Sequence, residues 1–328
     1  MKTSIIVAVV VLIVIVGGVA GLYMTGYFAP TKTKIRVGEL TGDIHHLALH
    51  VALANGYFDQ YGLEVERYEF INGPTLMQHF VVGELDFAYA GIPPTMTARA
   101  NAMSSGNVTY LPVVISSANL EGSVLVVNPA VIPSVADLNG KKIGTPGTGS
   151  IQDIMLTIYA RDHNLTITKY PSSISNLPLM YSRGEIDGFI GWEVIPSIAM
   201  YDFNASVLLT SYDMMPNHQC CVFAVSSAYL AAHPDIVAKM VAVHNAAMDF
   251  INTHPAEAKV IAANYTRQPM QVIDLAFPHV VYSKTVNINS TKTFLTNMIQ
   301  LDIIKTLNAS QVDSFVSGLV DTRYATVQ

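Results

Sequence analysis

Three histidines near the start of the chain could bind a metal ion or a polar ligand. His45, His46 and His50 lie within six residues, and His46 and His50 are four positions apart. On a helix that spacing puts two imidazoles on one face, an arrangement that can hold zinc. No further ligand can be assigned from spacing, and the HExxH motif is absent. We therefore predict no metal and expect His45 or His46 to contact an organic ligand. A metal site and a purely structural role are the alternatives.

Two adjacent cysteines, Cys220 and Cys221, are the only ones in the chain. A single pair builds no disulfide framework, and a disulfide between sequence neighbours would be strained. They open the apolar run CCVFAV, which is typical of a buried strand. We predict two buried thiols in a strand.

A glycine-rich loop, TPGTGS at 145–150, could approach a ligand closely. Gly147 and Gly149 free the backbone, while Thr148 and Ser150 add hydroxyl groups. A helix beginning here would present free N–H groups, which attract anionic groups. No G-K-[ST] follows, so nucleotide binding is not predicted. The alternative is a plain turn in which Ser150 caps the helix.

Trp192, the only tryptophan, stands beside Glu193 in the segment GWEVIP. An indole in such a loop can stack on a planar or alkyl ligand. The alternative is ordinary packing between two parts of the fold.

Alternating strands and helices must position these residues. Strands are predicted at 35–40, 63–70, 85–91 and 110–118, with helices at 45–58, at 74–84 and from 92 onward. Connections this short imply a mostly parallel sheet covered by helices. The phrase GELDFAYAG then returns, about 100 residues later, as GEIDGFIGW, which predicts two similar lobes. From about Ala228 the pattern is helical nearly to the end.

Five phrases carry a family resemblance: GYFDQYGLEV, GELDFAYAG, DLNGKKIGTPGTGS, RGEIDGFIGWEVIPS and AYLAAHPDIV. In this order they resemble the substrate-binding proteins of nitrate, sulfonate and taurine ABC importers, over roughly residues 34–280. The resemblance implies an α/β, two-lobed type II periplasmic-binding-protein fold with two crossover hinge strands. Such a protein closes over a small solute and delivers it to permease and ATPase subunits. The same superfamily includes synthases for the thiamine pyrimidine, but we predict no cofactor and no enzymatic activity for this chain.

The resemblance, together with the uncharged stretch at the start of the chain, gives the domain organisation. It puts the crossovers near 117–124 and 216–223. The prediction is a membrane segment at 1–29, a linker at 30–34, lobe I from 35–118 plus 223–328, and lobe II from 119–222.

Ligands of open α/β sheets bind beyond the carboxyl ends of the strands. The loops in that position are 40–46, 71–74, 91–95, 145–150 and 191–196, and the resemblance selects the same five. The predicted ligand-binding residues lie in these loops or at a crossover: Thr41, Gly42, Asp43, His45, His46, Asn72, Gly91, Ile92, Pro93, Glu121, Gly147, Thr148, Gly149, Ser150, Trp192 and Glu193.

The charges near these loops bear on the ligand. Arg99 and Arg183 are the nearest basic residues, whereas Asp43, Glu121 and Glu193 are acidic. A zwitterionic or amine-bearing solute, such as taurine or the pyrimidine precursor of thiamine, therefore fits at least as well as nitrate or a sulfonate. Bare anions remain an alternative through backbone donors.

Residues 3–29 carry no charge, and about 20 apolar residues cross a ~30 Å hydrocarbon layer. The run is longer than the apolar core of a cleavable signal peptide and lacks a good cleavage site. We predict a retained single-pass anchor with the binding domain outside the cytoplasm. A cleaved signal peptide is the alternative.

The amino-acid composition is consistent with a location outside the cytoplasm. Charged residues make up 13% of the chain, against about 25% in ordinary domains. The net charge of −6 argues against a nucleic-acid partner. Candidate glycosylation sequons begin at Asn107, Asn164, Asn204, Asn264, Asn289 and Asn308.

Three other functions stay open as alternatives. The first is a metal-binding importer component that uses His45, His46 and His50. The second is an enzyme like the eukaryotic pyrimidine synthases, which carry a longer cysteine run where this chain has Cys220 and Cys221. The third is a surface filament subunit.

Overall fold

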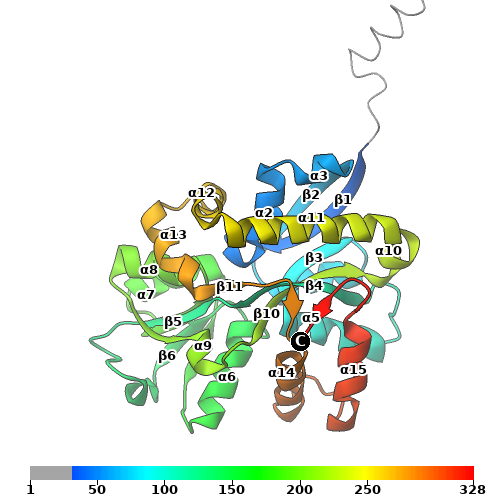
Figure 1. Cartoon of the computed structure of the whole chain (residues 1–328). Coiled ribbons are helices and arrows are strands. Elements are labelled where there is room, and N and C mark those ends of the chain that lie inside the picture. The colour runs from blue at the N-terminus through cyan, green and yellow to red at the C-terminus, as the bar shows by residue number, and fades with distance from the viewer. Residues whose placement is uncertain (1–31) are drawn as a thin grey trace, which may run out of the picture.

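The computed structural model describes residues 32–328, which form two large β-sheets covered by helices and one short two-stranded sheet (Figure 1). The larger sheet has six strands in the order β11-β4-β10-β3-β1-β2. Their bounds are β1 (Thr33–Leu40), β2 (Leu63–Phe70), β3 (Phe87–Gly91), β4 (Pro112–Glu121), β10 (Gln219–Ser226) and β11 (Val280–Tyr282). Strands β2, β1 and β3 run parallel, and β10 lies antiparallel between β3 and β4.

Helices cover both faces of this sheet. In Figure 1 one group lies above it: α2 (Leu47–Ala54), α3 (Tyr57–Gln60), α10 (Ser227–Ala232), α11 (Pro234–Thr253) and α12 (Pro255–Thr266). The other group lies below: α4 (Gly73–Val81), α5 (Ile92–Ser104), α14 (Ile288–Gln300) and α15 (Val312–Leu319). The buried strand β3, FAYAG, is apolar throughout because helices cover both of its sides.

The smaller sheet has five strands in the order β7-β6-β8-β5-β9. They are β5 (Ser123–Val127), β6 (Lys142–Thr145), β7 (Thr168–Pro171), β8 (Gly188–Trp192) and β9 (Ser206–Thr210). Its helices are α6 (Ile151–Asp162), α7 (Leu177–Ser182), α8 (Ile195–Phe203) and α9 (Ser211–Met214). Short 3-10 turns complete the chain: η1 (Ile44–His46), η2 (Val135–Leu138), η3 (Ile174–Asn176), η4 (Phe277–His279) and η5 (Ala309–Gln311).

The repeated Gly-Glu-apolar-Asp phrase has the same structural role in both sheets. In the larger sheet the Asp86 carboxylate accepts a hydrogen bond from the Arg36 backbone N–H, at 2.8 Å. In the smaller sheet the Asp187 carboxylate accepts one from Lys142 N–H, also at 2.8 Å. Each aspartate thus ties the start of the β3 or β8 strand to the neighbouring parallel strand. The repeated sequence motif therefore links neighbouring strands at one end of each sheet. This end is opposite to the loops that lead from the strands into the helices.

One glycine in each sheet lets a helix pack closely. A Cβ on Gly38 in β1 would lie 2.7 Å from Leu85 and 3.3 Å from Leu76. A Cβ on Gly144 in β6 would lie 2.7 Å from Leu177 and 2.8 Å from Ile186. The two glycines occupy equivalent positions in their sheets. This supports the prediction, made from the repeated motif, that the two halves of the chain have similar structures.

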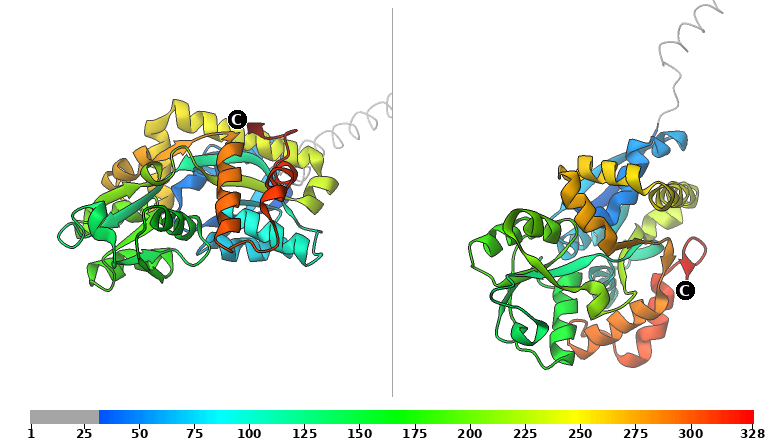
Figure 2. Two further views of the ribbon diagram at one scale, coloured as in Figure 1. Left: turned by 90° about the horizontal axis from the view of Figure 1, so that it is seen from below. Right: turned by 60° about the vertical axis from the view of Figure 1, so that its left-hand side comes forward.

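The chain passes between the sheets twice. After β4 a single residue, Gly122, leads into β5, and α9 with the following turn leads from β9 back to β10. The helix α13 (Met270–Ala276) comes from the far end of the chain and packs on α8 of the smaller sheet, so the C-terminal part spans both units (Figure 2). The predicted lobe boundaries remain a prediction.

The C-terminal third differs from expectation. It is not helical nearly to the end, because β11 pairs with β4, and β12 (Thr285–Val286) pairs with β13 (Thr326–Val327). Strands of two or three residues are too short to show a periodic pattern. The predicted membrane segment at 1–29 lies outside the described residues. Within 32–328, no helix has the length and apolar character needed to cross a bilayer.

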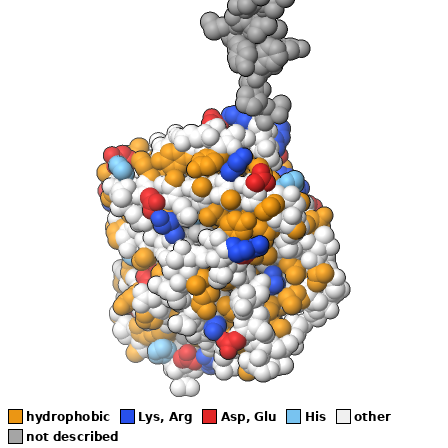
Figure 3. Space-filling view, turned by 45° about the vertical axis from the view of Figure 1, so that its right-hand side comes forward, with side chains coloured by type: hydrophobic (Ala, Val, Ile, Leu, Met, Phe, Trp, Pro, Cys, Tyr) orange, Lys and Arg blue, Asp and Glu red, His pale blue; other side chains and the backbone are white. Residues whose placement is uncertain are grey.

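The surface has few charges. On the face shown in Figure 3, charged side chains are separated by neutral surface and hydrophobic patches. The asparagines of all six sequons are exposed: Asn107, Asn164, Asn204, Asn264, Asn289 and Asn308. Their glycosylation remains a prediction.

A buried histidine in α11 should make stability depend on pH. His244 Nε2 lies 2.9 Å from the Ser117 carbonyl oxygen, and its Nδ1 lies 2.9 Å from the Tyr89 hydroxyl. The carbonyl only accepts, so Nε2 donates to it and Nδ1 accepts from Tyr89. Burial lowers the pKa of His244 from 6.5 to about 4, and the charge of Lys284 adds to the shift.

Between those two pH values the unfolded chain binds a proton that the folded chain does not. The free energy of unfolding should therefore fall as the pH drops from 6.5 to 4, by roughly 3 kcal/mol in total. Urea titrations at several pH values measure this slope. The variant His244→Gln should show a flatter profile, and the exposed-site control His233→Gln should not. Equal slopes in all three proteins would contradict the assignment.

Candidate ligand-binding site

The loops at the carboxyl ends of the parallel strands of both sheets meet around a small cavity of about 10 Å³. Its walls come from Leu40, Asp43, His45, Gly73, Gly91, Pro94, Ser150, Ile151, Gln152, Trp192 and Cys221. A cavity of this size has room for about one water-sized group. Neither arginine nor lysine is among the residues that line it.

Five predicted residues line this cavity: Asp43, His45, Gly91, Ser150 and Trp192. Others lie behind the wall with structural partners. The Thr41 hydroxyl donates to the Phe70 carbonyl oxygen, Asn72 caps α4, and the Glu121 carboxylate accepts from the Asn217 N–H. The remaining residues are His46 and Glu193, described below, Gly42 in its turn, Ile92 and Pro93 at the start of α5, and Gly147, Thr148 and Gly149 in the glycine-rich loop.

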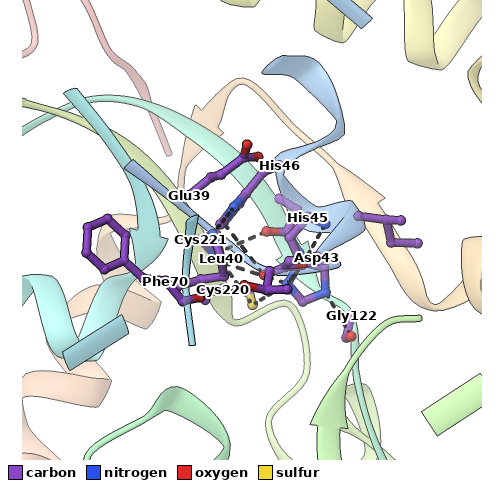
Figure 4. A network of polar contacts seen from close by, with 12 residues as sticks. Glu39, Leu40, Asp43, His45, His46, Phe70, Gly122, Cys220 and Cys221 are labelled. Carbon is purple, nitrogen blue, oxygen red and sulfur yellow. Dashed lines mark hydrogen bonds and ion pairs between the residues drawn. The ribbon is translucent and has the colours of Figure 1, made fainter. Parts of the chain in front are cut away.

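Asp43 and His45 form the centre of a buried polar network (Figure 4). Asp43 precedes η1, and its Oδ1 accepts the His45 backbone N–H at 2.8 Å. The His45 Nε2 lies 2.8 Å from the carbonyl oxygen of Gly122. Burial raises the pKa of Asp43 to about 7. Burial alone would lower the pKa of His45, but the charges of Asp43 and Cys220 outweigh it and raise that pKa to about 10.

Both thiols face the same histidine. The Sγ atoms of Cys220 and Cys221 lie 3.6 and 3.7 Å from His45 Nδ1, and 3.8 Å from each other. Both cysteines are free and buried in β10, as predicted. Burial opposes ionisation of Cys220, but contacts with Cys221 and the charge of His45 lower its pKa well below the usual range. The pKa of Cys221 is raised by burial and by its neighbour.

The glycine-rich loop supplies the opposite wall. Ser150 caps α6 by accepting the Asp153 N–H, which is the structural role considered from the sequence. The Gly149 N–H donates to the carboxylate of Asp153, and Lys169 pairs with the same carboxylate at 2.6 Å. The chain's own carboxylate therefore occupies part of the helix N-terminus that would otherwise attract an anion.

Several buried polar atoms at the cavity have no partner within the described part of the chain. They are Trp192 Nε1, Gln152 Oε1 and Asp43 Oδ2. The indole can only donate a hydrogen bond, and the two oxygens can accept one. An unpaired buried polar group costs about 1–3 kcal/mol. The cavity wall thus offers one donor and two acceptors to whatever enters.

Glu193 joins the two sheets instead of lining the cavity. Its Oε1 lies 2.6 Å from His279 Nδ1 in η4, and its backbone oxygen accepts the Ile44 N–H at 3.2 Å. Its own N–H donates to the Gly122 carbonyl oxygen at 3.1 Å. These bonds hold the loop after β8 against the segment after β1.

The three histidines do not form one ligand set. His50 Nε2 lies 2.6 Å from Glu39 Oε2, and the His50 ring stacks on Tyr265 with centroids 3.4 Å apart. His46 Nδ1 accepts the Leu40 N–H at 3.3 Å. The alternative metal set of His45, His46 and His50 is therefore wrong, because His50 contacts Glu39 and its donor atoms are not grouped with those of His45 and His46.

Six lining residues were not among those predicted: Leu40, Gly73, Pro94, Ile151, Gln152 and Cys221. Gln152 and Cys221 are the two of them with polar or ionisable side chains. Gln152 lies in the first turn of α6, where its Nε2 donates to Ser123 Oγ at 2.9 Å. Its place directly after the Ser150 cap was a usable signal. Cys221 reaches the cavity because β10 inserts between β3 and β4, a pairing that no local pattern reveals.

Comparison with known sequences identifies relatives. A 4-amino-5-hydroxymethyl-2-methylpyrimidine phosphate synthase of Aspergillus parasiticus is 28% identical over 233 residues, 65% of each chain. The match thus spans slightly less than two thirds of that relative. A binding protein of Brucella abortus strain 2308 is 24% identical over 300 residues, 88% of this chain and 84% of the relative.

Solved structures share the fold at low identity. The ligand-binding component of an ABC-type import system from Staphylococcus aureus, with zinc bound, has a TM-score of 0.73 at 17% identity, covering 88% of this chain and 99% of that one. The alkanesulfonate-binding protein SsuA from Xanthomonas axonopodis pv. citri, bound to MOPS, has a TM-score of 0.71 at 19% identity, covering 85% and 97%.

The periplasmic nitrate-binding protein NrtA from Synechocystis PCC 6803 is also similar, with a TM-score of 0.75 at 14% identity over 88% of this chain and 86% of that one. These likenesses show the α/β periplasmic-binding-protein fold. The sequence model of the NMT1-like family matches residues 29–265, more than half of the chain. The chain therefore belongs to the NMT1-like family.

Proposed function

We propose that this protein is the solute-binding component of an ABC importer and works outside the cytoplasm. The cavity at the meeting edges of the two sheets, with its unpaired buried polar atoms, carries the proposal. Sites of this kind occur where strand carboxyl ends converge. The structural relatives, which include importer components and periplasmic binding proteins, support the same function.

The solute that fits best is a small organic molecule bearing N–H groups. Asp43 Oδ2 and Gln152 Oε1 are acceptors without partners, and Trp192 contributes one donor and an aromatic ring. No lysine or arginine lines the cavity to neutralise a bare nitrate or sulfonate. An aminopyrimidine or the amine end of taurine satisfies the acceptors, and a planar ring can also stack on the indole.

Any such solute needs more space than the cavity of about 10 Å³ offers. The two lobes, 35–118 plus 223–328 and 119–222, therefore separate to admit it and close around it. The single-residue link at Gly122 and the connection 211–218 are the hinges. The protein, closed around its solute, then delivers the solute to permease and ATPase subunits.

Residues 1–29 serve as the retained membrane anchor. Their support is the uncharged stretch 3–29, followed by polar residues. Full-length protein expressed in cells should stay with the membrane pellet after an alkaline carbonate wash. Release into the supernatant, with an N-terminus shortened on mass spectrometry, would establish the cleaved signal peptide instead.

Solute binding is tested by calorimetry with taurine, alkanesulfonates, nitrate and aminopyrimidines, in the presence of a chelator. We expect an N–H-bearing solute to bind and raise the melting temperature. Asp43→Asn should weaken its binding about 10- to 100-fold, because a hydrogen bond to a charged group contributes about 1.5–3 kcal/mol. The exposed-site control Asp59→Asn should bind like wild type. Equal loss in both variants, or tight binding of bare anions alone, would contradict this solute class.

The names of the fungal relatives favour a second function, pyrimidine phosphate synthesis. The buried pair Cys220 and Cys221 beside His45 is the local feature that such an enzyme could use. The eukaryotic pyrimidine synthases use a histidine of their own chain as a substrate. An enzyme of this kind would therefore lose atoms of that side chain, and drop in intact mass, when it turns over with iron and its co-substrate. An unchanged intact mass would support the binding function alone.

A further inference from the structure

We propose that Asp43, His45, Cys220 and Cys221 bind one zinc ion at the floor of the cavity. All four residues are buried, and three of them line the cavity. The zinc ion would stay bound to these four side chains, and the site does not depend on which solute enters the cavity.

The distances among His45 Nδ1 and the two sulfurs match three corners of a tetrahedral site, and Asp43 Oδ1 lies at the matching distance from Nδ1. Zinc binds sulfur at about 2.3 Å and imidazole nitrogen or carboxylate oxygen at about 2.0–2.1 Å. Tetrahedral angles then put two sulfurs about 3.8 Å apart, nitrogen and sulfur about 3.6 Å apart, and nitrogen and oxygen about 3.3 Å apart. The chain has 3.8 Å between the two Sγ atoms, 3.6 and 3.7 Å from them to His45 Nδ1, and 3.3 Å from Nδ1 to Asp43 Oδ1.

The tautomer of His45 suits metal binding. Its Nε2 faces the Gly122 carbonyl oxygen at 2.8 Å, so in the neutral ring Nε2 carries the proton. The lone pair is then on Nδ1, which faces both thiols. A backbone carbonyl that accepts the second N–H is the usual support of a metal-binding histidine.

The strand is irregular where the thiols lie. Neighbouring residues of a regular strand point to opposite faces, yet both sulfurs contact one imidazole. The register of β10 against β4 shifts between Gln219 and Cys221 and again between Cys221 and Val222. Such a bulge redirects a side chain, and here it brings Cys220 and Cys221 to the same side.

His46 supports the site without joining it. Its Nδ1 accepts the Leu40 N–H, so its Nε2 carries the proton and lies 3.7 Å from Asp43 Oδ2. That oxygen has no hydrogen-bond partner in the described residues. A small shift of Asp43 toward the ion would leave His46 as the donor that orients the carboxylate.

The ion enters through the cavity and displaces two protons to solvent: the thiol proton of Cys221 and the proton that Cys220 shares with His45 Nδ1. The experiment uses chelator-treated, reduced full-length protein. Zinc titration against a competing chelator should give one ion per chain. Cobalt(II) should give a sulfur-to-metal charge-transfer band and the visible bands of a tetrahedral site. Zinc should also protect both cysteines of the wild-type protein from alkylation.

The double variant Cys220→Ser/Cys221→Ser should lose at least about 100-fold in zinc affinity, the scale reached when even a supporting contact is removed. The matched control His233→Asn, at an exposed histidine, should bind zinc like wild type. Unprotected cysteines in the wild-type protein, or unchanged affinity in the double variant, would overturn the site. Because solute binding is measured with chelator, failure of zinc to bind leaves the solute result intact, and the reverse also holds.

Discussion

Replacing Gly122 by alanine is expected to lower the free energy of unfolding by about 3–6 kcal/mol. The residue has φ +93°, and a Cβ there would lie 2.1 Å from His45 Nε2. Its carbonyl oxygen accepts hydrogen bonds from His45 and from the Glu193 N–H. Backbone strain, steric overlap and weakened buried hydrogen bonds would therefore act together at the link between the sheets. Chemical denaturation followed by circular dichroism measures the loss.

The matched control is Gly140→Ala. Gly140 has φ +76°, but a Cβ there would meet nothing within 4 Å. Its variant should lose only the cost of a positive φ, about 1 kcal/mol. If the two alanine variants were equally stable, the close approach between Gly122 and His45 would not exist in solution.

The second large effect concerns the buried carboxylate Glu39, which is fully inaccessible to solvent. Its Oε2 contacts His50, and Arg67 Nε lies 3.1 Å from its Oε1. The contact between Arg67 Nε and Glu39 Oε1 is short enough for an ion pair, but its geometry is not that of a hydrogen bond. Glu39 Oε1 therefore has no hydrogen-bond partner among the described residues. Removing one partner of a buried pair costs about 3–5 kcal/mol. Because Arg67 is 31% exposed, we expect Arg67→Met to cost about 2–4 kcal/mol.

Arg183→Met is the control for that variant. Arg183 pairs with Glu185 at 3.8 Å, and both side chains are exposed. Screening by water makes such a pair contribute less than about 1 kcal/mol. Urea denaturation of both variants at neutral pH gives the comparison. A loss for Arg67→Met no larger than for Arg183→Met would show that Glu39 is not held by this pair.

The strands and most helices could be predicted because each has a local signal. The alternating run 63–70 is the strand β2 with the same bounds, and the repeated phrase gave the equivalent strands β3 and β8. The loops predicted at the strand ends do meet at one cavity, because the carboxyl ends of parallel strands share an edge.

The part that could not be predicted depends on distant pairing. Cys221 reaches the cavity only because β10 inserts between β3 and β4, which lie about 100 or more residues earlier in the chain. The histidines were grouped by their spacing, yet the buried Glu39 draws His50 away from His45. Spacing reports which residues share a helix face, whereas the choice of partner depends on charges brought in by other strands.

The small volume of the cavity has a kinetic consequence. A space of about 10 Å³ cannot be entered by a solute while the chain stays shut. Under the proposed function, capture waits for a spontaneous opening, and at high solute concentration the capture rate levels off at the opening rate. The apparent affinity for the solute equals the affinity of the open form multiplied by the fraction of molecules that are open. A mutation far from the cavity that destabilises only the empty shut form, and not the form closed around the solute, would tighten capture without adding a single contact.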